Sequence, residues 1–293
     1  MATDFITLTN VVQMVVSGLL LGGVYALVGL GLTLAFGVMK IINMAHGEFL
    51  MLGGYLTFWL FTLANLNPLL SLPISMVALF GLGGLLQHTI VRRVVGKPEL
   101  TSKLLTFGIG IAIVGFALTA WSSDYRSVPY LSTAVDVGGV RLSTTRLLAF
   151  AVAMATSGAF YAFLRFTRGG HAIRATAQLR ELALVCGINV WRVHVIAFGL
   201  SASLAAIGGS LLSMMFTIYP EMGITFTIKA FAIIIMGGAG NFLGAFLAAM
   251  LLGVAETVGS LFVTAQAVEA IAFILLIGTL LVRPTGLFFG ERE

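Results

Sequence analysis

The fold is decided by a stretch near the N-terminus, residues 10–37, which reads NVVQMVVSGLLLGGVYALVGLGLTLAFG. It contains no Asp, Glu, Lys or Arg, and the charge-free region around it extends from Asp4 to Lys40. A helix needs about 20 predominantly apolar residues to cross the hydrocarbon core of a bilayer. The stretch is therefore long enough to span a membrane, and it has room for an additional half-helix.

The rest of the chain repeats this apolar pattern. Only 9% of its 293 residues are charged, against about 25% in soluble domains, and the mean hydropathy is +1.07. We predict one all-α domain over residues 1–293, a polytopic transmembrane helical bundle with about 8–10 spans, some of them broken or re-entrant. The predicted spans are 10–37, 48–65, 70–91, 104–122, 146–165, 193–218, a broken region that divides into 226–237 and 242–262, and 264–282.

Composition also narrows the chemistry. The N-terminus has no basic region and no small-residue cleavage motif, so we expect no removable signal peptide. A single cysteine, Cys186, excludes an intrachain disulfide. His46 and Glu48 have no third ligand nearby in the sequence, so we expect no metal site, and nothing indicates a cofactor. The net charge of +5 indicates basic cytoplasmic loops rather than binding of nucleic acid.

Basic residues predict the orientation, because Lys and Arg are enriched in the cytoplasmic loops of membrane proteins. One set of loops contains twelve basic residues, and the opposite set contains three, Arg126, Arg141 and Arg146. We expect the larger set, and with it the C-terminus, to be cytoplasmic. The N-terminus is then expected outside, and a cytoplasmic N-terminus is the alternative if the first stretch includes a half-helix. The larger set comprises Lys40, Arg92, Arg93, Lys97, Lys103, Arg165, Arg168, Arg174, Arg180, Arg192, Arg283 and Arg292.

Two interruptions of the apolar runs contain the candidate transport residues. One covers residues 41–47 and the other residues 237–241, in opposite halves of the chain. Irregular backbone within a bilayer is tolerated only where protein or a water-filled cavity satisfies its hydrogen bonds. In transporters built from repeats, a pair of such breaks indicates a transport path. We expect a translocation path at these breaks, the first of them near the inner membrane surface. The alternative is a structural role in backbone satisfaction or helix packing. The candidate path residues are Gly22, Asn43, His46, Glu48, Gly238 and Asn241.

Three other features lead to specific expectations. The extracytoplasmic loop 123–145 is predicted to form a small hairpin around Gly138-Gly139, either as a docking surface or as a cap on the helices. The cytoplasmic segment 166–192 is predicted to form a short helix that ends at Gly187, either docking a soluble partner or resting on anionic lipid. Lys229 and Glu256 are expected either to form a buried pair or to leave Lys229 extended toward the headgroups.

Six motifs lie in order along nearly the whole chain. They are GVYAL at 23–27, GLTLAFGVM at 31–39, INMAHGEF at 42–49, the segment 170–189, GGAGN with GA at 237–245, and RPTGLF at 283–288. Together they resemble the permeases of branched-chain amino-acid ABC importers, and within that family the first of two unlike permease subunits. The resemblance implies a multi-pass permease of the bacterial inner membrane that forms the path for branched-chain or related amino acids.

The resemblance also implies a set of partners. These are a second permease subunit, two ATP-binding cassette ATPase subunits, an extracytoplasmic substrate-binding protein and membrane lipid, without nucleic acid. The ATPase subunits are expected to dock on loops that include 166–192. The docking residues implied there are Gly170, Arg174, Ala175, Gln178, Glu181, Ala183 and Gly187.

The sequence says less about the energy source and the transported solute. No Gly-x-x-x-x-Gly-Lys-Ser/Thr loop occurs, so we expect a transport subunit with no ATPase site and no catalytic residues. The alternative is a secondary carrier or channel for small polar solutes such as urea or amides. An intramembrane hydrolase is disfavoured because no Gly-x-Ser-x-Gly motif occurs. Nothing in the sequence selects among amino acids, urea and amides, or between homodimeric and heterodimeric pairing of permeases.

Overall fold

The computed structural model describes residues 8–288, and Asp4 and Arg292, which entered the orientation argument, lie outside this range. The described chain is helical apart from one two-stranded hairpin. In chain order the elements are α1 (Leu8–Met39), α2 (His46–Ala64), α3 (Pro68–Thr89), η1 (Val91–Arg93), α4 (Glu99–Trp121), β1 (Ala134–Val137), β2 (Val140–Ser143), α5 (Thr144–Phe166), α6 (Arg168–Gln178), α7 (Arg180–Val185), α8 (Val190–Ser213), α9 (Met222–Gly237), α10 (Phe242–Gly259) and α11 (Ala265–Val282).

Most of these helices are membrane spans by length and composition. Seven are long and apolar enough to cross a bilayer, namely α1, α2, α3, α4, α5, α8 and α10, and two shorter apolar helices are α9 and α11. The predicted all-α polytopic bundle is therefore confirmed for the described residues, and the chain is a multi-pass membrane protein. The predicted spans agree with the helix bounds to within five residues, because charge-free runs and their polar ends are local properties of the sequence.

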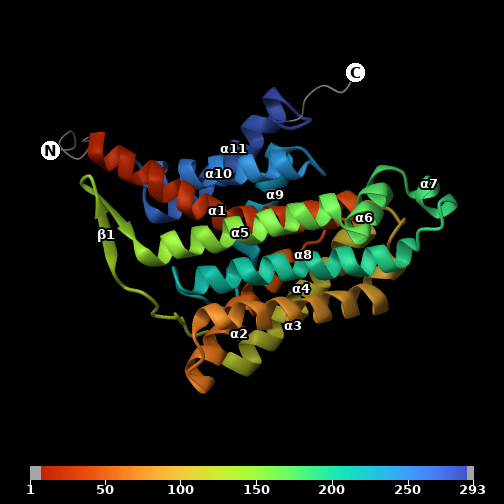
Figure 1. The fold of residues 1–293 in the computed structure, drawn as a ribbon, viewed down its shortest axis with the longest axis horizontal. Helices are drawn as coiled ribbons and strands as arrows, with labels where there is room; N and C mark the ends of the chain where they lie inside the picture. Colours follow the sequence, from red (N-terminus) through yellow and green to blue (C-terminus); the bar gives the residue numbers. More distant parts are fainter. Residues whose placement is uncertain (1–7, 289–293) are drawn as a thin grey trace.

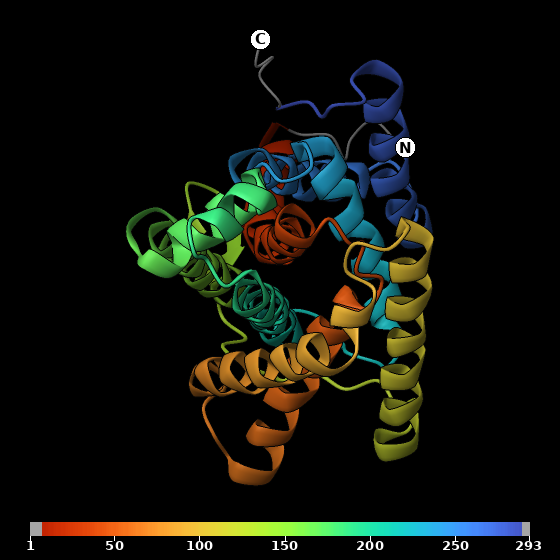
Figure 2. The same cartoon turned by 90° about the vertical axis from the view of Figure 1, so that its right-hand side faces the viewer.

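Helices α1 and α8 form the centre of the bundle. Figure 2 looks roughly along α1 and α8 and shows α1 surrounded by α5, α8, α9 and α10, with α4 seen from the side at the periphery. Small residues let these helices approach closely. At Gly22, for example, an added Cβ would lie 2.8 Å from the Met250 Cα on α10. This position supports the packing interpretation of Gly22 rather than pore lining.

The two ends of the bundle differ in structure (Figure 1). The hairpin end has β1 paired antiparallel with β2, with Ala134 opposite Ser143. Gly138 and Gly139 form the turn with φ angles of 61° and 85°, a conformation that glycine adopts without steric cost. The predicted hairpin is thus confirmed. The opposite end, which we call the α6–α7 end, carries the two short helices α6 and α7, which project from the bundle in Figure 1.

The segment 166–192 is the main local correction to the sequence prediction. It forms two helices instead of one, because Leu179 adopts an extended conformation with φ −146° and ψ 97° between α6 and α7. The end of the segment was predicted correctly, since Gly187 follows α7 with φ +77°. The break turns the apolar side chains of α7 outward, and Leu182 and Val185 are exposed.

Candidate functional site

The first interruption brings the chain back into the bundle before α2 begins. Residues 40–45 connect α1 to α2 without regular structure, and the His46 ring at the start of α2 contacts the Val28 carbonyl oxygen of α1 at 2.9 Å. A carbonyl only accepts, so Nε2 carries the hydrogen in this bond. Val28 precedes Met39 by 11 residues, about 16 Å along the helix. The start of α2 therefore lies inside the bundle, level with Val28 of α1 rather than with the end of that helix.

The partner of this interruption is the segment 214–221, which connects α8 to α9. Helix α9 has 16 residues and is about 24 Å long, shorter than the roughly 30 Å hydrocarbon core. The connecting backbone precedes α9 without regular structure, and its Ile218 exchanges two hydrogen bonds with Arg126, at 2.9 and 2.7 Å. Ile218 is fully buried. The buried non-helical backbone at Ile218 thus has its hydrogen bonds satisfied by protein.

The N-termini of α2 and α9 meet inside the bundle. The Gly47 N–H of α2 donates to Thr227 Oγ1 of α9 at 2.8 Å. The two backbones are so close that a Cβ added at Gly47 would lie 1.8 Å from the Gly223 carbonyl oxygen. Each helix N-terminus carries a partial positive charge from its unpaired N–H groups. Two such ends therefore produce a local positive potential in the interior.

Glu48 lies at this junction. Its side chain belongs to the first turn of α2 and faces the first turn of α9, where a Cβ added at Gly223 would lie 3.1 Å from the carboxyl carbon. On a third side, a Cβ added at Gly110 of α4 would lie 3.5 Å from the same carbon. Glu48 is 3% exposed, and it forms no ion pair with any described residue. The helix ends are the positive groups that face this carboxyl group.

The three predicted path residues at the first interruption are Asn43, His46 and Glu48, which we call the polar cluster because they are neighbours along the chain. The His46 ring faces α1, whereas the Glu48 carboxyl group faces α9 and α4. All three are buried, and each retains a polar atom without a hydrogen-bond partner among the described residues: Asn43 Nδ2, His46 Nδ1 and Glu48 Oε2. Such a buried unsatisfied group costs about 1–3 kcal/mol. Buried polar atoms without a protein partner are positions where water or a polar solute could complete the hydrogen bonding.

Helix α4 closes one side of the polar cluster. Its Thr106 Oγ1 accepts the Met44 N–H at 3.0 Å and lies 3.1 Å from the Ile42 carbonyl oxygen. These contacts fix the position of the irregular segment 40–45. The rest of α4 lies at the periphery of the bundle (Figure 2), and most of it is exposed. The outer surface of α4 is apolar and includes Leu104 and Phe107.

The second predicted break, residues 237–241, does not join the polar cluster. Gly238 and Gly240 adopt φ angles of 86° and 87° and form the turn between α9 and α10. Asn241 Oδ1 accepts the Gly244 N–H at 3.1 Å and so caps α10. Gly240 lies beside Gly37, near the end of α1. The turn is therefore near the α6–α7 end, and Gly238 and Asn241 are separated from the polar cluster by the length of α9.

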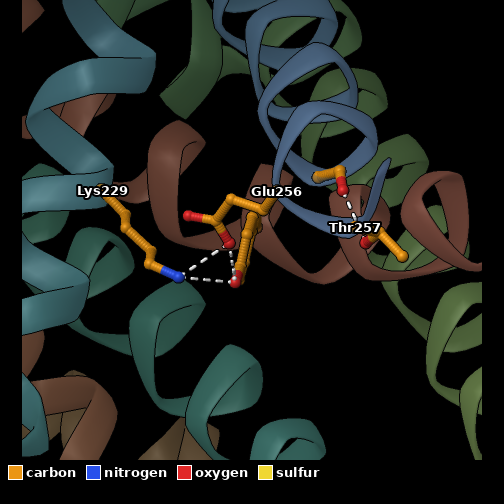
Figure 3. A network of polar contacts seen from close by, with 5 residues as sticks. Lys229, Glu256 and Thr257 are labelled. Atoms are coloured by element: carbon orange, nitrogen blue, oxygen red, sulfur yellow. Dashed lines mark hydrogen bonds and ion pairs between the residues drawn. The ribbon is translucent and has the colours of Figure 1, made fainter. Parts of the chain in front are cut away.

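A separate polar network joins α1, α9 and α10 (Figure 3). Lys229 Nζ lies 2.8 Å from Glu256 Oε2, and Tyr25 Oη donates to the same oxygen at 2.8 Å. The Lys229 ammonium also donates to Tyr25 Oη at 2.9 Å. The buried-pair alternative predicted for Lys229 and Glu256 is confirmed, and the pair gains a third member from α1. The network connects three helices: the Lys229 ammonium donates to two oxygens of the other members, and Glu256 Oε1 has no hydrogen-bond partner among the described residues.

The predicted docking residues divide into two groups. Arg174, Gln178, Glu181 and Gly187 are exposed, and Ala175 is half-buried. Gly170 and Ala183 are buried, and a Cβ added at Gly170 would lie 2.3 Å from the Phe163 carbonyl oxygen of α5. The first group is available to another protein, while Gly170 holds α6 against its own bundle.

Comparison with known proteins identifies the family. Residues 14–280 match the family described as branched-chain amino acid transport system / permease component. The chain is 32% identical to the high-affinity branched-chain amino acid transport system permease protein BraD of Pseudomonas aeruginosa, over 94% of each chain. It is 31% identical to the corresponding protein LivH of Salmonella typhimurium, over 94% of each chain. No solved structure matches the chain. The chain therefore belongs to the branched-chain amino acid transport system permease family.

Proposed function

We propose that this chain is the membrane-spanning permease subunit of an ATP-driven importer and forms the translocation path for branched-chain or related amino acids. Its family membership and its relatives' names support the transport role and the cargo. The observation that carries the proposal is the polar cluster at the buried junction of α2 and α9, with its unpartnered polar atoms. Interrupted helices with their N-termini at mid-membrane are a recurrent construction of transport sites.

The polar cluster suits the chemistry of a zwitterionic amino acid. The free Glu48 Oε2 accepts hydrogen bonds from an ammonium group, because an ionised carboxylate is an acceptor on all its lone pairs. The Asn43 Nδ2 group donates to a carboxylate, and the N-termini of α2 and α9 favour negative charge. Passage requires weak binding, and a few polar contacts without a closed pocket are consistent with transient contact during transport.

The orientation follows from the basic residues. We place the α6–α7 end and the C-terminus in the cytoplasm, and the hairpin end outside, in the inner membrane of a bacterium. The exposed residues Arg174, Gln178 and Glu181 then face the cytoplasm, where ATPase subunits dock. A substrate-binding protein docks at the hairpin end, and the apolar outer surface of α4 contacts a second permease subunit. The chain supplies no ATPase site of its own, consistent with the absence of a phosphate-binding loop from its sequence.

The complete transporter provides the test. A tagged chain purified from its native membrane should co-purify with ATPase subunits, and the reconstituted complex should import labelled leucine, isoleucine or valine only with ATP and binding protein. Uptake by the isolated chain without ATP would instead support a secondary carrier. In the complex, Glu48→Gln should lower uptake by about tenfold or more, the effect of losing one charge-assisted contact. The matched control Glu99→Gln, at an exposed position at the start of α4, should transport normally.

A further inference from the structure

A pocket of about 810 Å³ lies at the α6–α7 end, away from the polar cluster. It is an open hollow bordered by the end of α3, by η1 and by the beginning of α8. Its lining residues are Gln87, His88, Arg92, Arg93, Asn189, Trp191, Arg192, Val195 and Ile196. None of these residues is a candidate path residue or one of the seven named docking residues, although Asn189, Trp191 and Arg192 belong to the segment 166–192.

The pocket is strongly cationic. Arg92, Arg93 and Arg192 line it, no Asp or Glu does, and none of the three arginines forms an ion pair within the part of the chain that the structure describes. Guanidinium groups match the geometry of phosphate oxygens and bind them in a bidentate manner. Three unpaired arginines around one hollow therefore favour a phosphate-bearing ligand.

A buried amide in the pocket wall strengthens this assignment. Gln87 is fully buried, and neither its Oε1 nor its Nε2 has a hydrogen-bond partner among residues 8–288. A buried amide without partners is costly, and Nε2 is a donor suited to a phosphate oxygen. The pocket also includes the beginning of α8, a 24-residue helix whose first turn favours anions.

Exposed apolar side chains in the lining and near it favour a phosphate group that carries acyl chains over a free phosphate ion. Ile196 and Trp191 of α8 lie in the lining and are exposed, and Leu85 and Ile90 are exposed near the end of α3. Tryptophan is enriched where membrane helices reach the headgroups. The acyl chains of a phospholipid cover such apolar side chains, whereas a free phosphate ion would leave them exposed.

We propose that this pocket binds the headgroup phosphate of an anionic phospholipid, such as phosphatidylglycerol or cardiolipin. The three arginines and the Gln87 amide hold the phosphate, and the acyl chains lie along α3 and α8. Basic pockets between membrane helices are a known type of site for such lipids. The site requires only that the chain is a membrane protein, so it does not depend on the proposed transport function.

Native mass spectrometry of the purified full-length chain tests the site. Dioleoylphosphatidylglycerol and dioleoylphosphatidylcholine are titrated in neutral detergent, and phosphatidylglycerol should bind more tightly. The triple variant Arg92→Gln/Arg93→Gln/Arg192→Gln should lose this affinity by about 100-fold. Gln87→Leu should lose about tenfold without a change in charge. Its thermal stability in phosphatidylcholine should not fall, because the substitution removes two unsatisfied polar atoms.

A matched triple variant controls for general electrostatic attraction. Lys103→Gln/Arg168→Gln/Arg283→Gln removes the same charge from residues outside the pocket and should keep the affinity of the original chain. Equal losses in both triple variants would overturn the proposal, as would displacement of the lipid by millimolar inorganic phosphate. A pocket variant that keeps its lipid but no longer co-purifies with ATPase subunits would also overturn it, because the arginines would then dock a protein.

Discussion

The buried pair of Lys229 and Glu256 provides a quantitative prediction about what holds the bundle together. Their side chains are 11% and 4% exposed, so solvent screens the pair little. Lys229→Met leaves the Glu256 carboxylate buried with Tyr25 as its hydrogen-bonding partner. Removal of one partner from a buried pair costs about 3–5 kcal/mol, whereas replacing both by apolar groups of similar volume is close to neutral. We expect Lys229→Met to lower the free energy of unfolding by that amount and Lys229→Met/Glu256→Leu to restore most of it.

The assay is equilibrium unfolding in mixed micelles, followed by tryptophan fluorescence. Tyr25→Phe should cost about 1.5–3 kcal/mol, because it removes a hydrogen bond to a charged group. The control Lys103→Met breaks an exposed pair, with side chains 40% and 68% exposed, and should cost less than about 1 kcal/mol. The double variant could instead lose as much free energy of unfolding as the two single variants together. That result would refute this reasoning, since the loss would then come from packing rather than from an unpaired charge.

Two further predictions concern the helix junction and the projecting segment. Gly47→Ala should separate α2 from α9 and cost more than about 3 kcal/mol, because the added Cβ would lie 1.8 Å from the Gly223 carbonyl oxygen. Gly115→Ala on α4, where an added Cβ meets nothing within 4 Å, should be neutral or stabilising, and an equally harmful Gly115→Ala would contradict the steric argument. Glu181→Lys on α7 should leave the basal ATPase of the assembled complex intact and uncouple it from uptake. Normal uptake with normal substrate stimulation in this variant would count against docking at α7.

The sequence predicts the spans well because the evidence for them is local. Charge-free runs, the turn glycines at 138–139 and the glycine at 187 each report on their own segment, and each prediction is confirmed. The extended residue at Leu179 was not predicted, because Ala, Leu and Arg around it favour a continuous helix. The close contact of α6 with α5 at Gly170 was likewise not visible in the sequence.

The candidate site depends on contacts that no local pattern reveals. Gly47 and Thr227 are 180 positions apart, and their contact determines the depth at which α2 begins. The second interruption was expected at the conspicuous glycines 237–241, yet those residues form an ordinary turn and cap. The segment that meets α2 is 214–221, where the only sequence signal is Pro220 before the start of α9. The glycine-rich segment 237–241 therefore does not pack against the start of α2, whereas the N-terminus of the short helix α9 does.

The central claim is that the polar cluster lines a water-filled path. Cys186 is the only cysteine, so a Cys186→Ser background allows single cysteines to be placed at Asn43 and, as a buried apolar control, at Leu27. The measurement is labelling of the assembled transporter by a small, charged, membrane-impermeant thiol reagent. We expect Asn43→Cys to be labelled during turnover and to be protected by transported substrate, while Leu27→Cys stays unlabelled. Equal absence of labelling at both positions under turnover would contradict the account.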